Sequence, residues 1–177
     1  RMTSTLKNAA IAAAASLTLA AGAQAAEPTT LPASNTIMIE TTKGPVTVEL
    51  WPQVAPKHVE AFKQLTQKGF YDGLVFHRIV PGFVAQTGDP TGTGMGGPGY
   101  TLKAEFSDKP HVRGTLAMAR AASPDSAGSQ FYIVLEDAPH LNGNYTVFGQ
   151  VTSGMEVVDQ LKQNVDKMVK LSFIDAQ

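Results

Sequence analysis

The most informative stretch of this sequence runs from residue 76 to residue 89 and reads Phe76-His77-Arg78-Ile79-Val80-Pro81-Gly82-Phe83-Val84-Ala85-Gln86-Thr87-Gly88-Asp89. Two runs rich in β-branched and aromatic residues, Leu74–Ile79 and Phe83–Gln86, flank a Pro-Gly dipeptide. Such runs favour strands, and Pro-Gly is a strong turn signal. The stretch therefore predicts two short strands joined by a tight turn, with Arg78 on the first strand and Gln86 on the second.

Six further runs on either side of this stretch also predict strands. The first two flank the turn signal Thr42-Lys43-Gly44-Pro45 and predict a hairpin. Gly, Pro, Asp and Asn separate most of the others. The six predicted strands are Thr36–Thr41, Val46–Trp51, Thr115–Ala119, Gln130–Leu135, Thr146–Val151 and Val165–Phe173.

Two segments have helical rather than strand-like patterns. The segment Ala55–Leu65 has Pro56 at its first turn and apolar residues on one face, and Gly69 ends it. A second, shorter helix is predicted over Met155–Leu161. Many strands and only two helices favour an all-β class, either an antiparallel barrel or a sandwich.

The composition excludes several classes of protein. The 177 residues include 14 Lys and Arg against 15 Asp and Glu, which is too balanced for a protein that binds duplex nucleic acid. The hydrophobic fraction of 43% is too high for a disordered chain. The absence of cysteine excludes disulfides, thiolate metal sites and a cysteine nucleophile.

The first 25 residues have the pattern of a signal peptide. Arg1 and Lys7 precede an uncharged, Ala-rich run of about 13 residues, which is shorter than the ~20 that span a bilayer. The run ends in the small-x-small sequence Ala23-Gln24-Ala25, so we expect cleavage after Ala25 and export to the periplasm. Residues 26–35 then form a flexible, Pro-containing leader, and residues 36–177 the folded domain. Without residues 1–25 the net charge is −3, and no membrane association is expected after signal removal.

Several weak motifs carry little information. Gly92–Gly97 satisfies the dinucleotide pattern G-x-G-x-x-G, but Pro98 and Gly99 follow where a phosphate-binding helix would have to begin. The four histidines lack zinc-site spacing, and no G-x-S-x-G hydrolase motif is present. We therefore expect neither a metal nor a cofactor.

Two further blocks accompany the Phe76–Asp89 stretch, namely Gly128-Ser129-Gln130-Phe131 and Val147-Phe148-Gly149. Together the three blocks resemble the cyclophilin family of peptidyl-prolyl cis-trans isomerases, and with the predicted signal the chain looks like a periplasmic bacterial member. The resemblance covers Thr36 to Phe173. It implies a closed eight-stranded antiparallel β-barrel capped by two α-helices, which is compatible with the predicted strands and helices.

The implied activity is rotation about X-Pro peptide bonds. Their C–N bond has double-bond character and a rotation barrier of ~18–20 kcal/mol, while the cis and trans forms differ by only ≈0.5–1 kcal/mol. A catalyst therefore needs no nucleophile; it needs a donor near the prolyl nitrogen, which regains its lone pair in the twisted state. By resemblance Arg78 is that donor, and Gln86 orients it and contacts the substrate backbone.

The resemblance also assigns the residues that bind substrate. The proline pocket comprises Phe83, Val84, Tyr132 and Leu141, with Tyr145 at its edge. The groove for the peptide backbone comprises Ala119, Arg120 and Ala121, with His140 also assigned to it, while Gly94 and Gln130 form the rim of a second, shallower pocket. Phe131, next to Tyr132 on the same strand, is expected to point the opposite way, into the core.

Five positions depart from the common family pattern. Val84 replaces methionine, Tyr132 replaces phenylalanine, and the hydroxyl of a buried Tyr132 needs a partner. Arg120 replaces asparagine and adds charge beside the groove, and Tyr145 stands where eukaryotic members commonly have histidine. His140 replaces a tryptophan that helps to bind cyclosporin. We therefore expect retained isomerase activity with weakened cyclosporin binding.

Alternative interpretations of the same residues remain open. Taken alone, Phe83, Tyr132 and Leu141 would suit a core, and Arg78 would suit a surface; only their joint spacing favours a functional role. The pocket could also belong to a binding module that holds proline-containing segments without turnover. A carrier barrel is a third alternative, although the many bulky residues suggest a filled interior. We expect proline-containing polypeptides as partners and a monomeric chain.

Overall fold

The hairpin predicted around Pro81-Gly82 is present in the computed structural model, which describes residues 30–175. Strand β3 (Arg78–Val80) pairs with β4 (Val84–Thr87) in an antiparallel register that places Arg78 opposite Gln86. Gly82 adopts a positive φ of 70°, and Phe83 N donates to Val80 O at 2.9 Å. Proline at the second position and a left-handed glycine at the third are what a type II turn requires.

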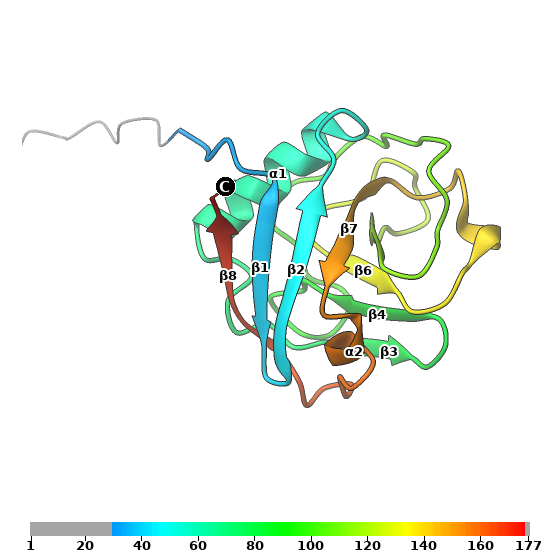
Figure 1. The fold of residues 1–177 in the computed structure, drawn as a ribbon. Helices are drawn as coiled ribbons and strands as arrows, with labels where there is room; N and C mark the ends of the chain where they lie inside the picture. The colour runs from blue at the N-terminus through cyan, green and yellow to red at the C-terminus, as the bar shows by residue number, and fades with distance from the viewer. Residues whose placement is uncertain (1–29, 176–177) are drawn as a thin grey trace, which may run out of the picture. The chain divides into compact units, whose positions relative to one another are not determined.

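All eight predicted strands occur in the described residues, with ends shifted by a few positions. They form one antiparallel sheet in the order β3-β4-β6-β5-β7-β2-β1-β8 (Figure 1). The hairpin loop between the first two strands is shorter than predicted, because Gly44 already pairs with Thr41. The remaining strands are β1 (Thr36–Thr41), β2 (Gly44–Leu50), β5 (Thr115–Met118), β6 (Phe131–Val134), β7 (Val147–Ser153) and β8 (Met168–Ile174).

The prediction of a closed barrel is wrong in one respect. Strands β3 and β8 are the two edges of the sheet and do not pair with each other within residues 30–175. Residues 74–76, predicted as the start of strand β3, instead join Gly73 in meeting residues 164–168 through one isolated bridge and four backbone hydrogen bonds of 2.7–3.0 Å. The sheet is therefore open along the strands themselves, and these irregular segments connect its edges.

Two α-helices accompany the sheet, as predicted. Helix α1 (Pro56–Gln67) has Pro56 in its first turn and is followed by Gly69 at φ 72°. Helix α2 (Met155–Val158) is shorter than predicted, because residues after Val158 continue with i→i+3 turns. Helix α1 lies against β8, and α2 lies against β2 (Figure 1). A 3₁₀ helix, η1 (Pro139–Leu141), was not predicted.

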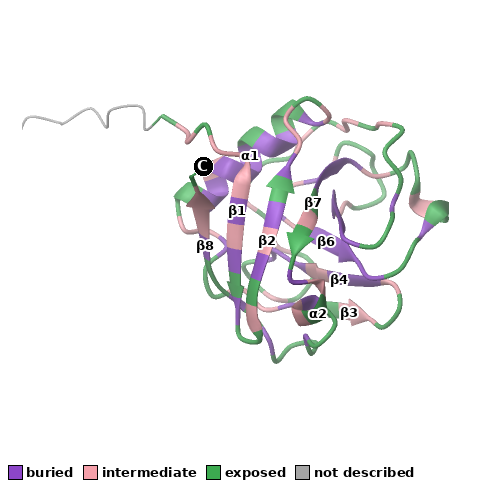
Figure 2. Cartoon of the chain, in the orientation of Figure 1, coloured by how far each residue is buried: buried purple, intermediate pink, exposed green. Residues whose placement is uncertain are grey.

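The sheet has an apolar cluster on each face, because successive strand residues point to opposite sides. Figure 2 shows the resulting alternation of buried and more exposed residues along β1 and β2. The larger cluster is the main core and holds Phe62 of α1 with Phe131 and Phe148, whose rings lie 5.2–6.2 Å apart. The smaller cluster holds Tyr132 and Val84. Phe131 and Tyr132 thus point to opposite faces, as predicted.

The predicted signal peptide, residues 1–25, lies outside the described residues, as do residues 26–29 of the leader. The end of the leader is bound to the domain. Asn35 O accepts a hydrogen bond from Leu50 N at 2.7 Å, and Pro32 O accepts one from Lys63 Nζ at 3.1 Å. No helix within residues 30–175 is long and apolar enough to cross a bilayer.

Asp89 organises the glycine-rich loop that follows β4. Its buried carboxylate accepts hydrogen bonds from Thr91 N and Oγ1, both at 2.8 Å, and from Gly94 N and Gly96 N at 2.6 and 3.1 Å. Burial raises the pKa of Asp89, but these hydrogen bonds outweigh burial and lower the pKa to about 2. The ionised carboxylate therefore holds the loop in one conformation.

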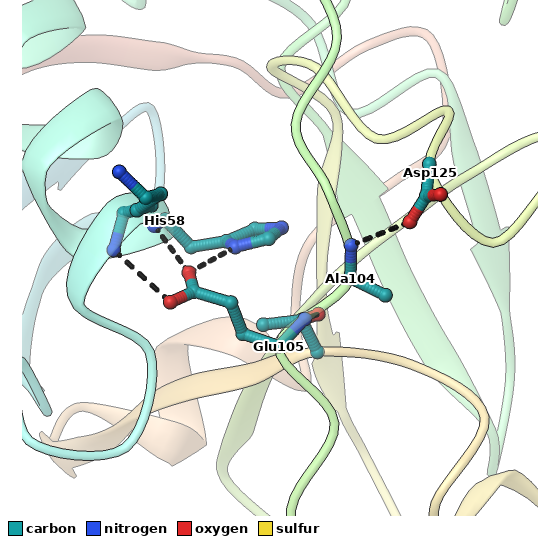
Figure 3. Close-up of polar contacts among 6 residues, drawn as sticks. His58, Ala104, Glu105 and Asp125 are labelled. Atoms are coloured by element: carbon teal, nitrogen blue, oxygen red, sulfur yellow. Dashed lines mark hydrogen bonds and ion pairs between the residues drawn. The ribbon is translucent and has the colours of Figure 1, made fainter.

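Glu105 anchors a second loop to the start of α1 (Figure 3). Its carboxylate accepts hydrogen bonds from Lys57 N at 3.2 Å and His58 N at 2.8 Å, and it lies 2.6 Å from Nδ1 of the buried His58. The N-cap residue Ala55 offers no side-chain cap, so a carboxylate distant in sequence satisfies the free N–H groups of the first turn. Burial raises the pKa of Glu105, but the hydrogen bonds from His58 and Lys57 produce a net lowering.

We expect Glu105→Ala to lower the free energy of unfolding by about 2 kcal/mol, since charge-assisted hydrogen bonds and a helix cap are lost together. Urea denaturation measures the change. The matched control is Glu60→Ala on the exposed face of the same helix, which should change stability by less than about 0.5 kcal/mol. Equal effects of the two substitutions would contradict the capping role.

We expect Asp89 to contribute about 2 kcal/mol of stability at neutral pH, because its pKa falls from 3.8 in the unfolded chain to about 2. A carboxyl whose pKa is lowered by folding stabilises the protein above the unfolded value. This contribution should disappear as the pH falls from about 4 to 2. Urea unfolding across this range should show a shallower pH dependence for Asp89→Asn than for the wild type or the exposed control Asp108→Asn.

Candidate active site

Four residues that lie side by side on four neighbouring strands form one row at the candidate site. Arg78 of β3 lies opposite Gln86 of β4, Gln86 lies opposite Tyr132 of β6, and Tyr132 lies opposite Ala117 of β5. Residues directly opposite each other in an antiparallel sheet point to the same face. The antiparallel register thus brings a cation, an amide and an aromatic ring together on the face that holds the smaller apolar cluster.

A pocket of about 180 Å³ opens on this face. Its walls are apolar or aromatic, and Arg78, Gln86 and Arg120 supply its polar side chains apart from the tyrosine hydroxyls. Every residue predicted as catalytic or as part of the proline pocket lines it. The lining consists of Arg78, Phe83, Val84, Gln86, Ala119, Arg120, Tyr132, Leu141 and Tyr145.

The arginine at this pocket is oriented by a chain of hydrogen bonds. Arg78 Nη1 donates to Gln86 Oε1 at 3.3 Å, and Gln86 Nε2 donates to Gln130 Oε1 at 3.0 Å. Gln130 Nε2 in turn donates to the carbonyl oxygens of Gly94 and Gly96 at 3.0 and 2.9 Å. Because an arginine can only donate and a carbonyl can only accept, both amide side chains have a single permitted orientation.

A second pocket, of about 790 Å³, adjoins the first, and the two share Gln86, Ala119 and Arg120. Gly94, Gln130 and Ala121, which were assigned to the groove and to the rim of a second pocket, line it. The glycine-rich loop held by Asp89 supplies much of the wall. Sequence reasoning missed Met95 and Tyr100 of this lining, because an apolar residue in a loop carries no periodic signal.

Arg120 lies between the two pockets and is held in place by backbone carbonyls. Its Nε donates to Asn144 O at 3.0 Å, and its Nη1 donates to Ala121 O and Ala122 O, both at 3.1 Å. The guanidinium also lies 4.8 Å from the ring centre of Tyr145, a distance at which a cation is attracted to an aromatic face. Its charge is therefore fixed beside the groove.

His140 is the one predicted site residue that lines neither pocket. It is exposed on η1, and its ring stacks on Phe83 with ring centres 5.5 Å apart. His140 therefore supports the outer side of the pocket wall rather than its interior.

The hydroxyl of Tyr132 has the partner that its burial requires. It lies 2.8 Å from Nε2 of His111, and the two rings stack with centres 5.9 Å apart. Burial raises the pKa of Tyr132, so the phenol stays neutral. Sequence reasoning missed His111, which precedes β5 and has no motif around it.

The chemical capacity of the site follows from these groups. Among the residues lining the smaller pocket there is no carboxylate, cysteine or histidine, so no acid–base pair or thiol nucleophile faces its interior. The pocket instead places a permanently charged, oriented donor beside an apolar slot. This arrangement can bind a small apolar ring and stabilise a lone pair that develops beside it.

Comparisons with known proteins agree with this geometry. Residues 36–173 match the family model for cyclophilin type peptidyl-prolyl cis-trans isomerase/CLD. A probable peptidyl-prolyl cis-trans isomerase of Brucella suis is 44% identical across 93% of this chain and 94% of the relative. Peptidyl-prolyl cis-trans isomerase B of Bacillus subtilis is 58% identical across 61% of this chain and 76% of the relative.

A solved structure is also similar. The crystal structure of a cyclophilin type isomerase from Cryptosporidium parvum, determined in the presence of the dipeptide Ala-Pro, superposes with a TM-score of 0.76. It is 32% identical and covers 80% of this chain and 99% of that protein. The chain therefore belongs to the cyclophilin-type peptidyl-prolyl cis-trans isomerases and is an enzyme of that family.

Proposed function

We propose that this enzyme rotates X-Pro bonds in exported polypeptides by transition-state stabilisation, with Arg78 as the catalytic donor and without a covalent intermediate. The observation that carries this proposal is the oriented guanidinium at an apolar pocket of about 180 Å³. In the Cryptosporidium parvum structure the small molecule present is Ala-Pro, which supports proline-containing segments as substrates. The signal-like sequence of residues 1–25 supports a periplasmic location.

The proposed mechanism depends on the difference between the planar and the twisted amide. The prolyl ring enters the slot formed by Phe83, Tyr132 and Leu141, and the rest of the chain rotates about the C–N bond. As the amide twists, its resonance is lost and the prolyl nitrogen regains a lone pair. A guanidinium N–H directed at that nitrogen gains a hydrogen bond only in the twisted state, so it lowers the barrier rather than merely binding substrate.

The groove residues hold the peptide on the N-terminal side of proline. Ala119, Arg120 and Ala121 follow β5 and border the second pocket. Gln86 both orients Arg78 and reaches toward the substrate backbone. Holding one side of the X-Pro bond in the slot and the other in the groove restricts motion to the rotation itself.

We expect Arg78→Ala to reduce kcat/KM roughly 10³-fold, which corresponds to a transition-state donor worth about 4 kcal/mol. Peptide affinity should fall only a few-fold, because the apolar slot is unchanged. A proline-peptide isomerisation assay and a binding titration measure the two quantities. Arg78→Lys keeps the charge without the planar fork and should recover only part of the activity.

The same two measurements distinguish the proposed isomerase from a binding module. If Arg78→Ala isomerised X-Pro bonds at the wild-type rate, the catalytic role of Arg78 would be wrong. Loss of peptide affinity in step with loss of turnover would instead favour a module whose role is to hold proline-containing segments.

We expect cyclosporin to inhibit this enzyme only well above low nanomolar concentrations. His140 presents a smaller ring than tryptophan and already stacks on Phe83, so less apolar surface is available to the inhibitor. His140→Trp should therefore lower the inhibition constant for cyclosporin. His140→Gln, a control at the same position without an aromatic ring, should not. Low-nanomolar inhibition of the wild type in the isomerisation assay would contradict this expectation.

A further inference from the structure

His111 is a buried titratable residue directly behind the proline pocket. Its side chain is 1% exposed and bridges two elements of the site. The ring Nε2 lies 2.8 Å from the hydroxyl of Tyr132, and Nδ1 lies 3.2 Å from Oδ1 of Asn142. The imidazole thus connects the pocket wall on β6 with the segment that follows η1.

The hydrogen bonds around Asn142 determine which ring nitrogen carries the proton. The backbone N of His111 donates to Asn142 Oδ1 at 2.7 Å, which identifies this atom as the amide oxygen, an acceptor only. His111 Nδ1, which faces the same oxygen, must therefore be protonated. In a neutral imidazole Nε2 is then the acceptor, so the Tyr132 hydroxyl donates to it.

The direction of this bond matters for the pocket. Tyr132 lines the pocket with its ring, while its hydroxyl hydrogen points toward His111. Within residues 30–175, His111 Nε2 is the only hydrogen-bond partner found for this hydroxyl. Neutral His111 thus keeps the polar hydrogen of Tyr132 directed away from the position that a prolyl ring would occupy.

We propose that His111 is a positioning residue that couples proline binding to its own protonation, because it sets the direction of the Tyr132 hydroxyl hydrogen. This inference rests on the proposed function of the pocket. When Nε2 gains a proton, it becomes a donor, and the hydroxyl hydrogen of Tyr132 must turn away from His111 without another acceptor in place. An unpaired polar hydrogen at the wall of an apolar slot opposes binding of the prolyl ring.

The other groups packed around His111 do not favour an imidazolium. Tyr145 meets the His111 ring edge-on with centres 6.2 Å apart, and the guanidinium of Arg120 lies 4.8 Å from the centre of the same Tyr145 ring. His140 of η1 is a further cationic group when protonated. Burial lowers the pKa of His111, the hydrogen bond to Asn142 raises it, and His140 lowers it, with a net lowering below 6.5. Neutral His111 is therefore the ground state at neutral pH.

Proline binding should lower the pKa of His111 further, because the bound ring disfavours the orientation of the Tyr132 hydroxyl that a protonated His111 requires. By linkage, peptide binding is then weaker where His111 is protonated. A further lowering of one pKa unit corresponds to about tenfold weaker binding below both pKa values. The effect should appear in KM and leave kcat nearly constant, since the proposed catalytic donor is a permanently charged guanidinium.

The test uses the mature enzyme and a blocked Ala-Pro peptide without titratable side chains. Nitrogen NMR of the imidazole should show the Nδ1–H tautomer at neutral pH and a His111 pKa that falls on saturation with peptide. Isomerisation kinetics should show KM rising as the pH falls below about 6.5 while kcat stays flat. An Nε2–H tautomer, or a KM constant to the lowest pH at which the enzyme is folded, would overturn the proposal.

Tyr132→Phe supplies the decisive variant, because it keeps the ring and removes only the hydroxyl. Its KM should lose most of the pH dependence, whereas His140→Gln should retain it. The same pH dependence in Tyr132→Phe as in the wild type would exclude coupling through the hydroxyl. The tautomer and the peptide-linked pKa of His111 are measured without turnover. A result that contradicts the His111 proposal is therefore distinguishable from a result that contradicts the proposed role of Arg78.

Discussion

The site depends on a chain of hydrogen bonds that can run in only one direction. Arg78 has only donors, and the carbonyls of Gly94 and Gly96 only accept, so the amides of Gln86 and Gln130 between them cannot flip without breaking a bond. The loop that supplies the carbonyls is itself held by Asp89. The buried carboxylate of Asp89 thus holds the Arg78 guanidinium in place through the loop and the two glutamines. The proposed catalysis by a fixed donor needs this kind of preorganisation.

This chain of bonds requires a particular strand register. A slip of one residue between β3 and β4 would turn either Arg78 or Gln86 to the opposite face of the sheet. The register is protected by the main core, because Ala85 and Ile133 alternate with the site residues and fill the other face. Packing on the main-core face therefore fixes the register of the site face, and the short Pro-Gly hairpin fixes the pairing at one end.

Local patterns predicted much of this fold and site. Alternating strands, Pro56 at the start of α1 and the Pro81-Gly82 turn are properties of neighbouring residues, and all of them were found. The family resemblance supplied the pocket residues, which the structure brings together. The contacts of Glu105 with α1 and of His111 with Tyr132 join residues 47 and 21 positions apart. No periodicity encodes such pairs. The closed barrel was implied by the family resemblance, whereas here β3 and β8 do not pair and the irregular segments beside them join the sheet edges.

The smaller apolar cluster has two roles that are physically linked. Val84 and Tyr132 pack with Ala117, Val134 and Val147 to cover one face of the sheet, and the same Val84 and Tyr132 line the smaller pocket, which is the proposed proline site. The space inside a binding pocket must stay open for the ligand, whereas a core gains stability when its space is filled. Larger side chains here would stabilise the sheet only by occupying the space a prolyl ring needs. The hydroxyl of Tyr132 adds a second constraint, because it requires a buried acceptor. His111 meets that requirement. In the proposed coupling, the orientation of the Tyr132 hydroxyl therefore depends on whether His111 is protonated.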